Sequence, residues 1–181
     1  MKTLFLALSF LLIHSTLALA KTNYDRKHFK HWVDNDKDCR DKRAEVLKDR
    51  SLIDVTYKVR KNGKRCVVAS GKWNDYYYPE ILTDASKIDI DHIVPLKHAW
   101  DLGANLWSAK KREIFANDPL NLVITNRSYN RQKGAQTPLS WSPSNREYYC
   151  KYLNDWIKVK RKYKFTISTE ILKYQKEAHC I

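Results

Sequence analysis

The chain has 181 residues, and its 34 Lys and Arg against 20 Asp and Glu give a formal net charge of +14. A hydrophobic content of 43% excludes a fully disordered chain, and only four glycines exclude collagen-like or glycine-rich repeats. This length predicts one domain or two small ones. The basic excess favours an anionic partner such as nucleic acid, an acidic polysaccharide or a lipid surface.

Residues 1–20 are typical of a secretory signal peptide. Lys2 supplies a short positive region, residues 4–13 form a nearly unbroken apolar run, and Ala18-Leu19-Ala20 matches the small-x-small cleavage pattern. We therefore expect cleavage after Ala20 and an exported domain over 21–181, either periplasmic or secreted. An uncleaved membrane anchor is the alternative, but the run is shorter than the roughly 20 residues that a membrane-spanning helix needs. No later segment predicts a membrane partner.

Four cysteines remain in the mature chain: Cys39, Cys66, Cys150 and Cys180. An even number in an exported protein favours two disulfides. A structural zinc site is the alternative, but such sites bring their ligands in close pairs, and no such pair is present. Of the three possible pairings we favour Cys39–Cys66 with Cys150–Cys180, because each closes a shorter loop.

The first half of the mature chain predicts a helix followed by a β-hairpin. In chain order the expected elements are a helix over 41–49 with Asp41 as its N-cap, a strand over 53–59, a hairpin turn at 61–64, a returning strand over 65–69 that extends towards Trp73, and a loop at 76–79.

The second half predicts two strands among several helices. The expected elements are a strand over 88–94, helical segments over 98–107 and 110–115, a turn at 117–119, a strand over 120–125, a short polar helix over 126–133 stopped by Gly134, and helices over 146–162 and 168–178. No repeat or linker interrupts them, so the fold class expected is α+β in a single domain.

Polar residues of this second half suit the hydrolysis of a phosphodiester. That reaction must deprotonate a water, neutralise charge on the leaving oxygen and hold the phosphate. A neutral imidazole suits the first task, and a hard cation on oxygen ligands suits the second. His92 is therefore the candidate base, with Asp91 and Asn130 as candidate ligands. Asp91 and His92 point to opposite faces of an ideal strand, so a shared site requires a bend or bulge, and an ordinary surface Asp-His pair is the alternative.

Three segments in order carry a family resemblance. They are DIDHIVPL at 89–96, FANDPLNL at 115–122 and NRQKG at 130–134, with Trp141-Ser142-Pro143 after them. Together they resemble the HNH nucleases, also called His-Me finger or ββα-metal nucleases, and more narrowly the small exported bacterial members. The resemblance runs from about residue 29 to residue 180. It implies a ββα-metal finger at about 88–134, with additional helices and an N-terminal β-hairpin around it.

The same resemblance implies roles for matching residues. His92 is expected to be the general base that activates water. Asp91 and Asn130 are expected to bind one divalent metal ion, with Mg²⁺ expected first and Mn²⁺ as the alternative. Asn121 is expected to hold the two strands together and to orient His92 through backbone contacts.

Arg131 and Lys133 are expected to lie near the scissile phosphate or the DNA backbone. The widely spread positive charge predicts salt-sensitive affinity without sequence preference. We therefore expect a monomeric, exported endonuclease that hydrolyses DNA, or RNA as a further substrate, with low sequence specificity. The alternative is a catalytically silent nucleic-acid-binding protein on the same scaffold.

Overall fold

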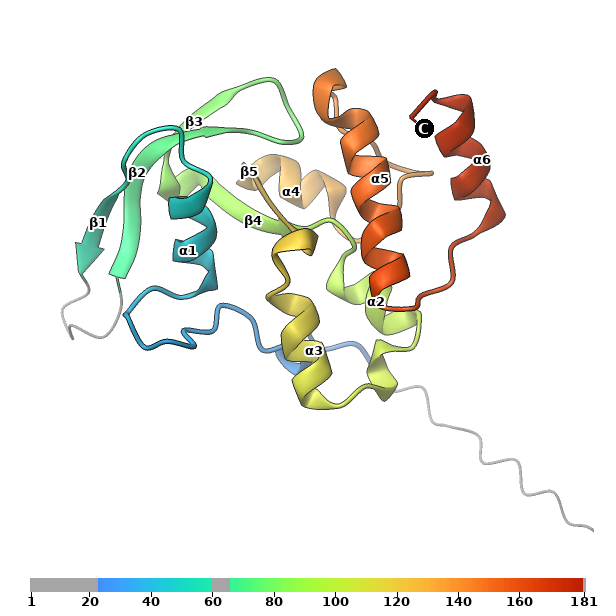
Figure 1. Ribbon diagram of the computed structural model, residues 1–181, viewed down its shortest axis with the longest axis horizontal. Helices are drawn as coiled ribbons and strands as arrows, with labels where there is room; N and C mark the ends of the chain where they lie inside the picture. The colour runs from blue at the N-terminus through green and yellow to red at the C-terminus, as the bar shows by residue number, and fades with distance from the viewer. Residues whose placement is uncertain (1–22, 60–65, 181) are drawn as a thin grey trace, which may run out of the picture.

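The computed structural model describes residues 23–59 and 66–180. Figure 1 shows a three-stranded sheet at one end, a pair of strands in the middle and a group of helices at the other end. The sheet has the order β1-β2-β3, and both neighbouring pairs are antiparallel. Its strands are β1 (Thr56–Val59), β2 (Cys66–Asn74) and β3 (Ile81–Asp84), and helix α1 (Lys42–Asp49) lies against it.

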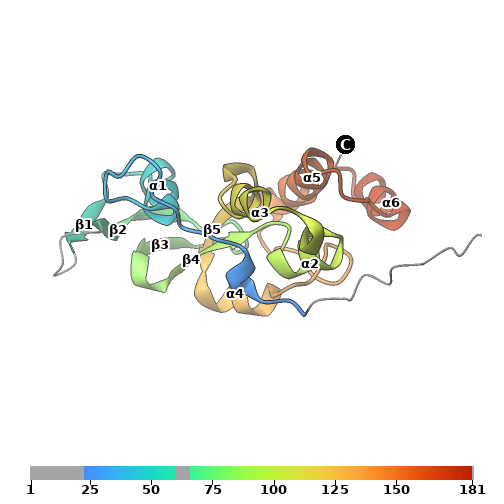
Figure 2. The ribbon, with the colours of Figure 1, turned by 90° about the horizontal axis from the view of Figure 1, so that it is seen from below.

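The central unit consists of two antiparallel strands followed directly by a helix. Strands β4 (Ile88–His92) and β5 (Leu122–Asn126) pair in one continuous register, from Ile88 opposite Asn126 to His92 opposite Leu122. Helix α4 (Arg127–Lys133) starts where β5 ends and contacts both strands. Figure 2 shows α4 on one side of the two strands and α1 and α3 (Ala109–Ala116) on the other.

Helices form the rest of the described chain. Between β4 and β5 the chain forms the helices α2 (Leu96–Asp101) and α3, with the short 3-10 helices η3 (Ala104–Leu106) and η4 (Pro119–Asn121). After α4 it continues into α5 (Arg146–Lys162) and α6 (Thr169–Glu177), which lie next to each other at the edge of the molecule. Two further 3-10 helices are η1 (Arg26–His28) and η2 (Ala85–Lys87). No helix in the described ranges is both long and apolar enough to cross a membrane.

Short polar side chains begin most of these helices. Asp41 accepts a hydrogen bond from the Ala44 amide at the start of α1, as predicted, and Asn126 accepts one from the Ser128 amide at the start of α4. Ser108, Asn145 and Ser168 cap α3, α5 and α6 in the same way. Such caps satisfy backbone amides that have no partner within the helix, and therefore fix where each helix starts.

Two apolar clusters meet at the central strands. The first packs the buried side of α5, including Tyr152 and Trp156, against Val123, Ala99 and Phe115. The second packs α1 and the three-stranded sheet against the isoleucines of β4 and their partners on β5, with Trp73 at its centre. Strands β4 and β5 are thus covered on both faces, and this is why side chains on either face are buried.

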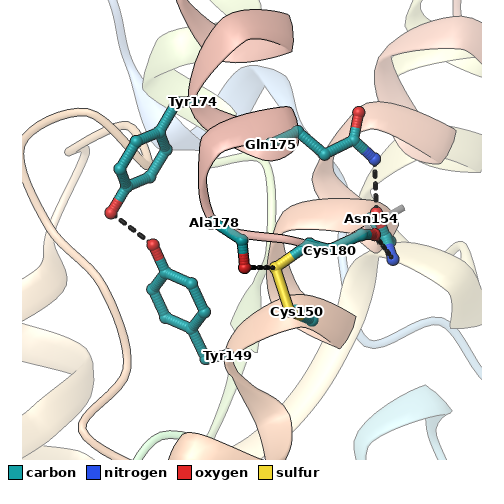
Figure 3. The surroundings of a disulfide bond; sticks show 7 residues. All are labelled: Tyr149, Cys150, Asn154, Tyr174, Gln175, Ala178 and Cys180. Atoms are coloured by element: carbon teal, nitrogen blue, oxygen red, sulfur yellow. Dashed lines mark hydrogen bonds between the residues drawn. A yellow bond between two sulfur atoms is a disulfide. The ribbon is translucent and has the colours of Figure 1, made fainter.

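Both predicted disulfides are confirmed. Cys39 is bonded to Cys66 and Cys150 to Cys180, and no described cysteine is free. The first joins the segment before α1 to the start of β2. The second joins α5 to the residues after α6. Figure 3 shows two hydrogen bonds beside it, one between the Tyr149 and Tyr174 hydroxyls and one that the Gln175 amide donates to Asn154. The disulfides therefore fix the segment before α1 and the residues after α6 to other parts of the chain.

The mixed α and β architecture is confirmed, with differences in detail. The helix predicted over 146–162 has those bounds, whereas the strand predicted over 53–59 is limited to Thr56–Val59. Strand β3 was not predicted at all, because only Leu82 of its four residues is buried. The predicted hairpin turn at 61–64 and the signal peptide lie outside the described residues.

Candidate active site

The two faces of β4 carry different chemistry. Ile88, Ile90 and His92 alternate with Asp89 and Asp91, so the two sets point to opposite faces of the strand. No bulge separates Asp91 from His92, because the ladder with β5 stays in register up to His92. The strand ends at that residue, and the chain bends at the next two residues, Ile93 and Val94.

The Asp91 carboxylate is held by two donors on one oxygen. Tyr77 donates its hydroxyl hydrogen to Asp91 Oδ2 over 2.6 Å, and Lys133 Nζ lies 2.7 Å from the same atom. Both donors are fully buried, and the Asp91 side chain is 10% exposed. Among the described residues, none donates to the other oxygen, Oδ1. Asp91 therefore has one oxygen occupied by the protein and one left for another partner.

Lys133 also ties the carboxylate to the backbone of its neighbour. Its ammonium donates to the carbonyl of His92 over 2.9 Å. Burial lowers the pKa of Lys133, and the charge of Asp91 opposes that shift. The predicted place of Lys133 beside a substrate phosphate does not fit this geometry, because its side chain has no exposed surface. Lys133 instead neutralises Asp91 from inside the protein.

The His92 ring is buried and fixed in orientation. Its Nε2 lies 2.9 Å from the carbonyl oxygen of Ala116, and Trp32 stacks on the ring at a centroid distance of 6.1 Å. Burial lowers the pKa of His92 to about 4, so the ring is neutral at neutral pH. Because a carbonyl can only accept, the single hydrogen of the neutral ring is on Nε2, and the Nδ1 lone pair is free to take a proton.

Asn117 anchors the N-terminal segment that carries Trp32. Its amide nitrogen donates to the carbonyl of Lys30 over 2.9 Å, and its oxygen accepts from the Val33 amide over 3.3 Å. The predicted turn at 117–119 therefore has a structural role. It holds the N-terminal segment so that Trp32 covers the His92 ring.

Asn121 clamps the chain immediately after His92. Its side-chain oxygen accepts from the Val94 amide over 2.8 Å, and its nitrogen donates to the Val94 carbonyl over 3.2 Å. The Asn121 carbonyl also accepts from the Ile93 amide over 2.9 Å. Asn121 is fully buried. These contacts act on the residues that follow His92 and not on its ring, and the role of Asn121 in orienting His92 stays a prediction.

Asn130 is paired with Asp89 and not with Asp91. Its Nδ2 donates to Asp89 Oδ2 over 3.0 Å, and Arg127 Nε lies 3.4 Å from the other carboxylate oxygen of Asp89. Asp89 and Asp91 share a face of β4, so all three oxygen-bearing side chains lie on the α4 side of the strands. Arg131, one residue further along α4, is exposed and accessible to a phosphate.

Tyr77, which donates to Asp91, was not singled out by the sequence. It lies in a run of three tyrosines with no strand or helix periodicity, so its direction could not be predicted. The only available signal was the aspartate two residues earlier, because Asp75 Oδ1 accepts from the Tyr77 amide over 2.7 Å. Such a side-chain-to-backbone bond is typical of a tight turn.

A second group of carboxylates lies away from these strands. Asp34, Asp36 and Asp38 follow one another at every second position and bring one oxygen each within 4.8 Å of the others. Arg40 forms an ion pair with Asp38 and takes up part of the negative charge. Exposed acidic loops commonly have this form without an ion, and we assign no function to it.

Comparison with known proteins decides the family. The family described as GmrSD restriction endonucleases, C-terminal domain, matches residues 41–170. The chain belongs to this family. The matched range contains β4, β5 and α4, and with them Asp91, His92, Asn121, Asn130, Arg131 and Lys133. Membership in a nuclease family agrees with the resemblance found in the sequence, while the HNH subtype and the narrower bacterial branch stay predictions.

A related protein supports export. The chain is 36% identical over 148 residues to a protein of Arthroderma benhamiae named "Uncharacterized secreted protein", covering 81% of this chain and 69% of that protein. That name and the two disulfides are consistent with an extracellular location for this member of the GmrSD C-terminal family. No solved structure matches the chain.

Proposed function

We propose that the protein is an exported, metal-dependent endonuclease that hydrolyses DNA, and RNA as a further substrate, with low sequence specificity. The observation that carries the proposal is the His92 ring. A buried, neutral imidazole whose Nε2 hydrogen is bound to Ala116 presents the lone pair of Nδ1, and it does so next to Asp91 in the chain. Such a group can accept a proton from water.

The donor atoms on the α4 side of the strands fit a hard divalent cation. Asp91 Oδ1 has no donor among the described residues, and Asp89 and Asn130 carry further oxygen atoms on the same side of the strand pair. Mg²⁺ and Mn²⁺ prefer such carboxylate and amide oxygens and retain several waters. We assign Asp91 and Asn130 as the ligands. When bound, the ion would neutralise the charge that develops on the phosphate and on the departing oxygen.

The chain's own residues would then perform the remaining tasks. His92 takes a proton at Nδ1 from the attacking water, while its Nε2 hydrogen remains on the Ala116 carbonyl. Asn121 and Lys133 hold the backbone around His92, so the ring direction is fixed before substrate binds. Arg131 is exposed on α4 and is placed to hold a phosphate. The net charge of +14 favours binding along any phosphate backbone.

Substitution of His92 tests this function against a matched histidine. His98 on α2 also has its pKa lowered to about 4, mainly by burial, but its Nε2 has no partner in the described chain. Plasmid DNA is incubated with wild type, His92→Ala and His98→Ala in Mg²⁺, in Mn²⁺ and in EDTA. We expect His92→Ala to lose about 10²–10⁴-fold in rate, His98→Ala to remain active, and EDTA to stop wild type.

DNA binding is measured on the same variants by gel shift at low salt. A protein that loses cleavage through His92→Ala but still shifts DNA supports the proposed base. Cleavage at the wild-type rate by pure His92→Ala protein would remove His92 from that role. Binding by wild type with no cleavage in any metal would identify a silent nucleic-acid-binding protein on this scaffold.

A further inference from the structure

Tyr77 is a buried side chain whose hydroxyl donates to Asp91 of the candidate site. It belongs to the loop between β2 and β3, and this loop is attached to β5 through Asp75. The Asp75 carboxylate accepts from the Tyr77 amide over 2.7 Å, from the Thr125 hydroxyl over 2.9 Å and from the Asn126 amide over 2.6 Å. The backbone of Tyr77 is therefore fixed relative to the strand pair that carries Asp91.

The Tyr77 ring is immobilised by other aromatic rings. Trp141 packs against it edge to face at a centroid distance of 4.7 Å, and Tyr152 does the same at 5.9 Å. Tyr77 has no exposed surface. With backbone and ring both held, its hydroxyl has one position, which is 2.6 Å from Asp91 Oδ2.

Oxygen Oδ2 of Asp91 receives two donors while Oδ1 receives none from the described residues. Lys133 supplies charge to Oδ2 from α4, and Tyr77 supplies a neutral hydrogen bond from the loop between β2 and β3. Two donors from different directions stop rotation of the carboxylate about its Cβ–Cγ bond. Oδ1 is thereby kept in one direction, towards the small exposed part of the side chain.

We propose that Tyr77 is a positioning residue for metal binding, because its hydrogen bond reserves Asp91 Oδ2 for the protein and presents Asp91 Oδ1 alone to the cation. The inference rests on the proposed function, since it takes Asp91 as a metal ligand. Partners that hydrogen-bond to a metal ligand orient it, and their loss typically weakens metal binding by about 10–100-fold.

The chain offers a matched control for Tyr77. Tyr152 is also a buried tyrosine of the same aromatic cluster, 1% exposed, but its hydroxyl has no hydrogen-bond partner in the described chain. Tyr77→Phe and Tyr152→Phe each remove one hydroxyl and keep the ring. They differ in whether a hydrogen bond to Asp91 is lost.

The experiment measures Mn²⁺ binding by electron paramagnetic resonance on the intact protein without substrate. Binding that disappears in Asp91→Asn defines the site, which separates it from ions held by other acidic side chains such as the Asp34 group. We expect Tyr77→Phe to weaken this binding by about 10–100-fold, and Tyr152→Phe to leave it at the wild-type value. Thermal unfolding of each variant shows that it is folded.

The half-saturating Mn²⁺ concentration for plasmid cleavage gives a second measurement, which should rise in Tyr77→Phe and not in Tyr152→Phe. Wild-type Mn²⁺ affinity in folded Tyr77→Phe, with binding still lost in Asp91→Asn, would overturn the positioning role and leave the proposed function intact. Mn²⁺ binding that persists unchanged in Asp91→Asn would overturn the metal assignment itself. Equal losses in both tyrosine variants would show a packing effect and also overturn the inference.

Discussion

Asp91 and His92 are neighbours in the chain, yet the protein treats their side chains in opposite ways. Asp91 faces α4, where Lys133 and Tyr77 both donate to its carboxylate. His92 faces the apolar side of the strand pair and is held neutral by burial. A single step along a β-strand thus separates a charged environment from an uncharged one, and a nuclease site requires both.

The largest effect on stability is expected when the Lys133 ammonium is removed from the Asp91 side of β4. Lys133→Met keeps the length of the side chain but leaves the buried carboxylate of Asp91 without its counter-charge. We expect the free energy of unfolding in urea to fall by about 3–5 kcal/mol, which is typical when one member of a buried ion pair is removed. Adding Asp91→Asn should restore part of the loss.

A surface lysine provides the reference for that measurement. Lys151 forms an ion pair with Asp155, and its side chain is 58% exposed. Lys151→Met should cost less than about 1 kcal/mol, as exposed ion pairs usually do. Similar losses for the two substitutions would show that the Asp91 face is not an isolated, charged environment.

The next test lowers the pH until the buried His92 ring becomes protonated. The pKa of His92 is about 4 in the folded protein against 6.5 in the unfolded chain, so the unfolded chain binds more protons between these values. Stability is therefore fully present above pH 6.5, falls as the pH decreases towards 4, and the fall contributed by His92 amounts to at most ~3 kcal/mol. Urea unfolding from pH 7 to pH 4 measures it.

The pH dependence is assigned by comparing slopes. His92→Gln should flatten the decrease between pH 6.5 and 4, whatever its effect on stability at pH 7. His98 contributes to the decrease in the same direction but is only partly buried, so His98→Gln should flatten it less. An unchanged slope in His92→Gln would show that the ring is not held neutral by the fold.

A smaller loss of stability is expected on substitution of Asn121, which binds the chain immediately after His92. Asn121→Ala removes both side-chain bonds to Val94 and leaves a buried amide and carbonyl without partners. We expect a loss of about 2 kcal/mol, since an unsatisfied buried polar group costs 1–3 kcal/mol. The exposed Asn35 serves as the matched control, and Asn35→Ala should be neutral. Chemical denaturation of both variants distinguishes the two outcomes.

Much of this arrangement could be predicted from local signals. The bounds of α5 follow from the spacing of its apolar residues, and the start of α4 follows from Asn126, because periodicity and capping are encoded within a few residues. Asn121 and His92 could be identified because their motifs are recognised in the sequence, in order, without knowledge of the fold. The even number of cysteines predicted two disulfides, and loop length predicted their pairing.

The rest depends on tertiary contacts that a linear pattern does not contain. Lys133 lies in a polar helix that reads as a phosphate-binding surface, and only the packing of α4 against β4 shows that it is buried. Which of Tyr76, Tyr77 and Tyr78 points inward is decided by the hydrogen bond that Asp75 accepts from the Tyr77 amide, and the other donors to Asp75 are about fifty residues away. Strand β3 forms because its backbone pairs with the edge of β2.

The smallest expected effect compares the two carboxylates on one face of β4. Asp89 contacts Arg127 and Asn130, but its side chain is 30% exposed, so water replaces those partners readily. Asp89→Ala should therefore cost about 1 kcal/mol or less, within the range of surface ion pairs. Asp91→Ala removes the counter-charge of fully buried Lys133 and should cost several times as much. A larger loss of stability for Asp89→Ala than for Asp91→Ala would mean that the charged centre of this face is at Asp89, three residues before His92. The charged and the uncharged environment would then no longer belong to the adjacent residues Asp91 and His92.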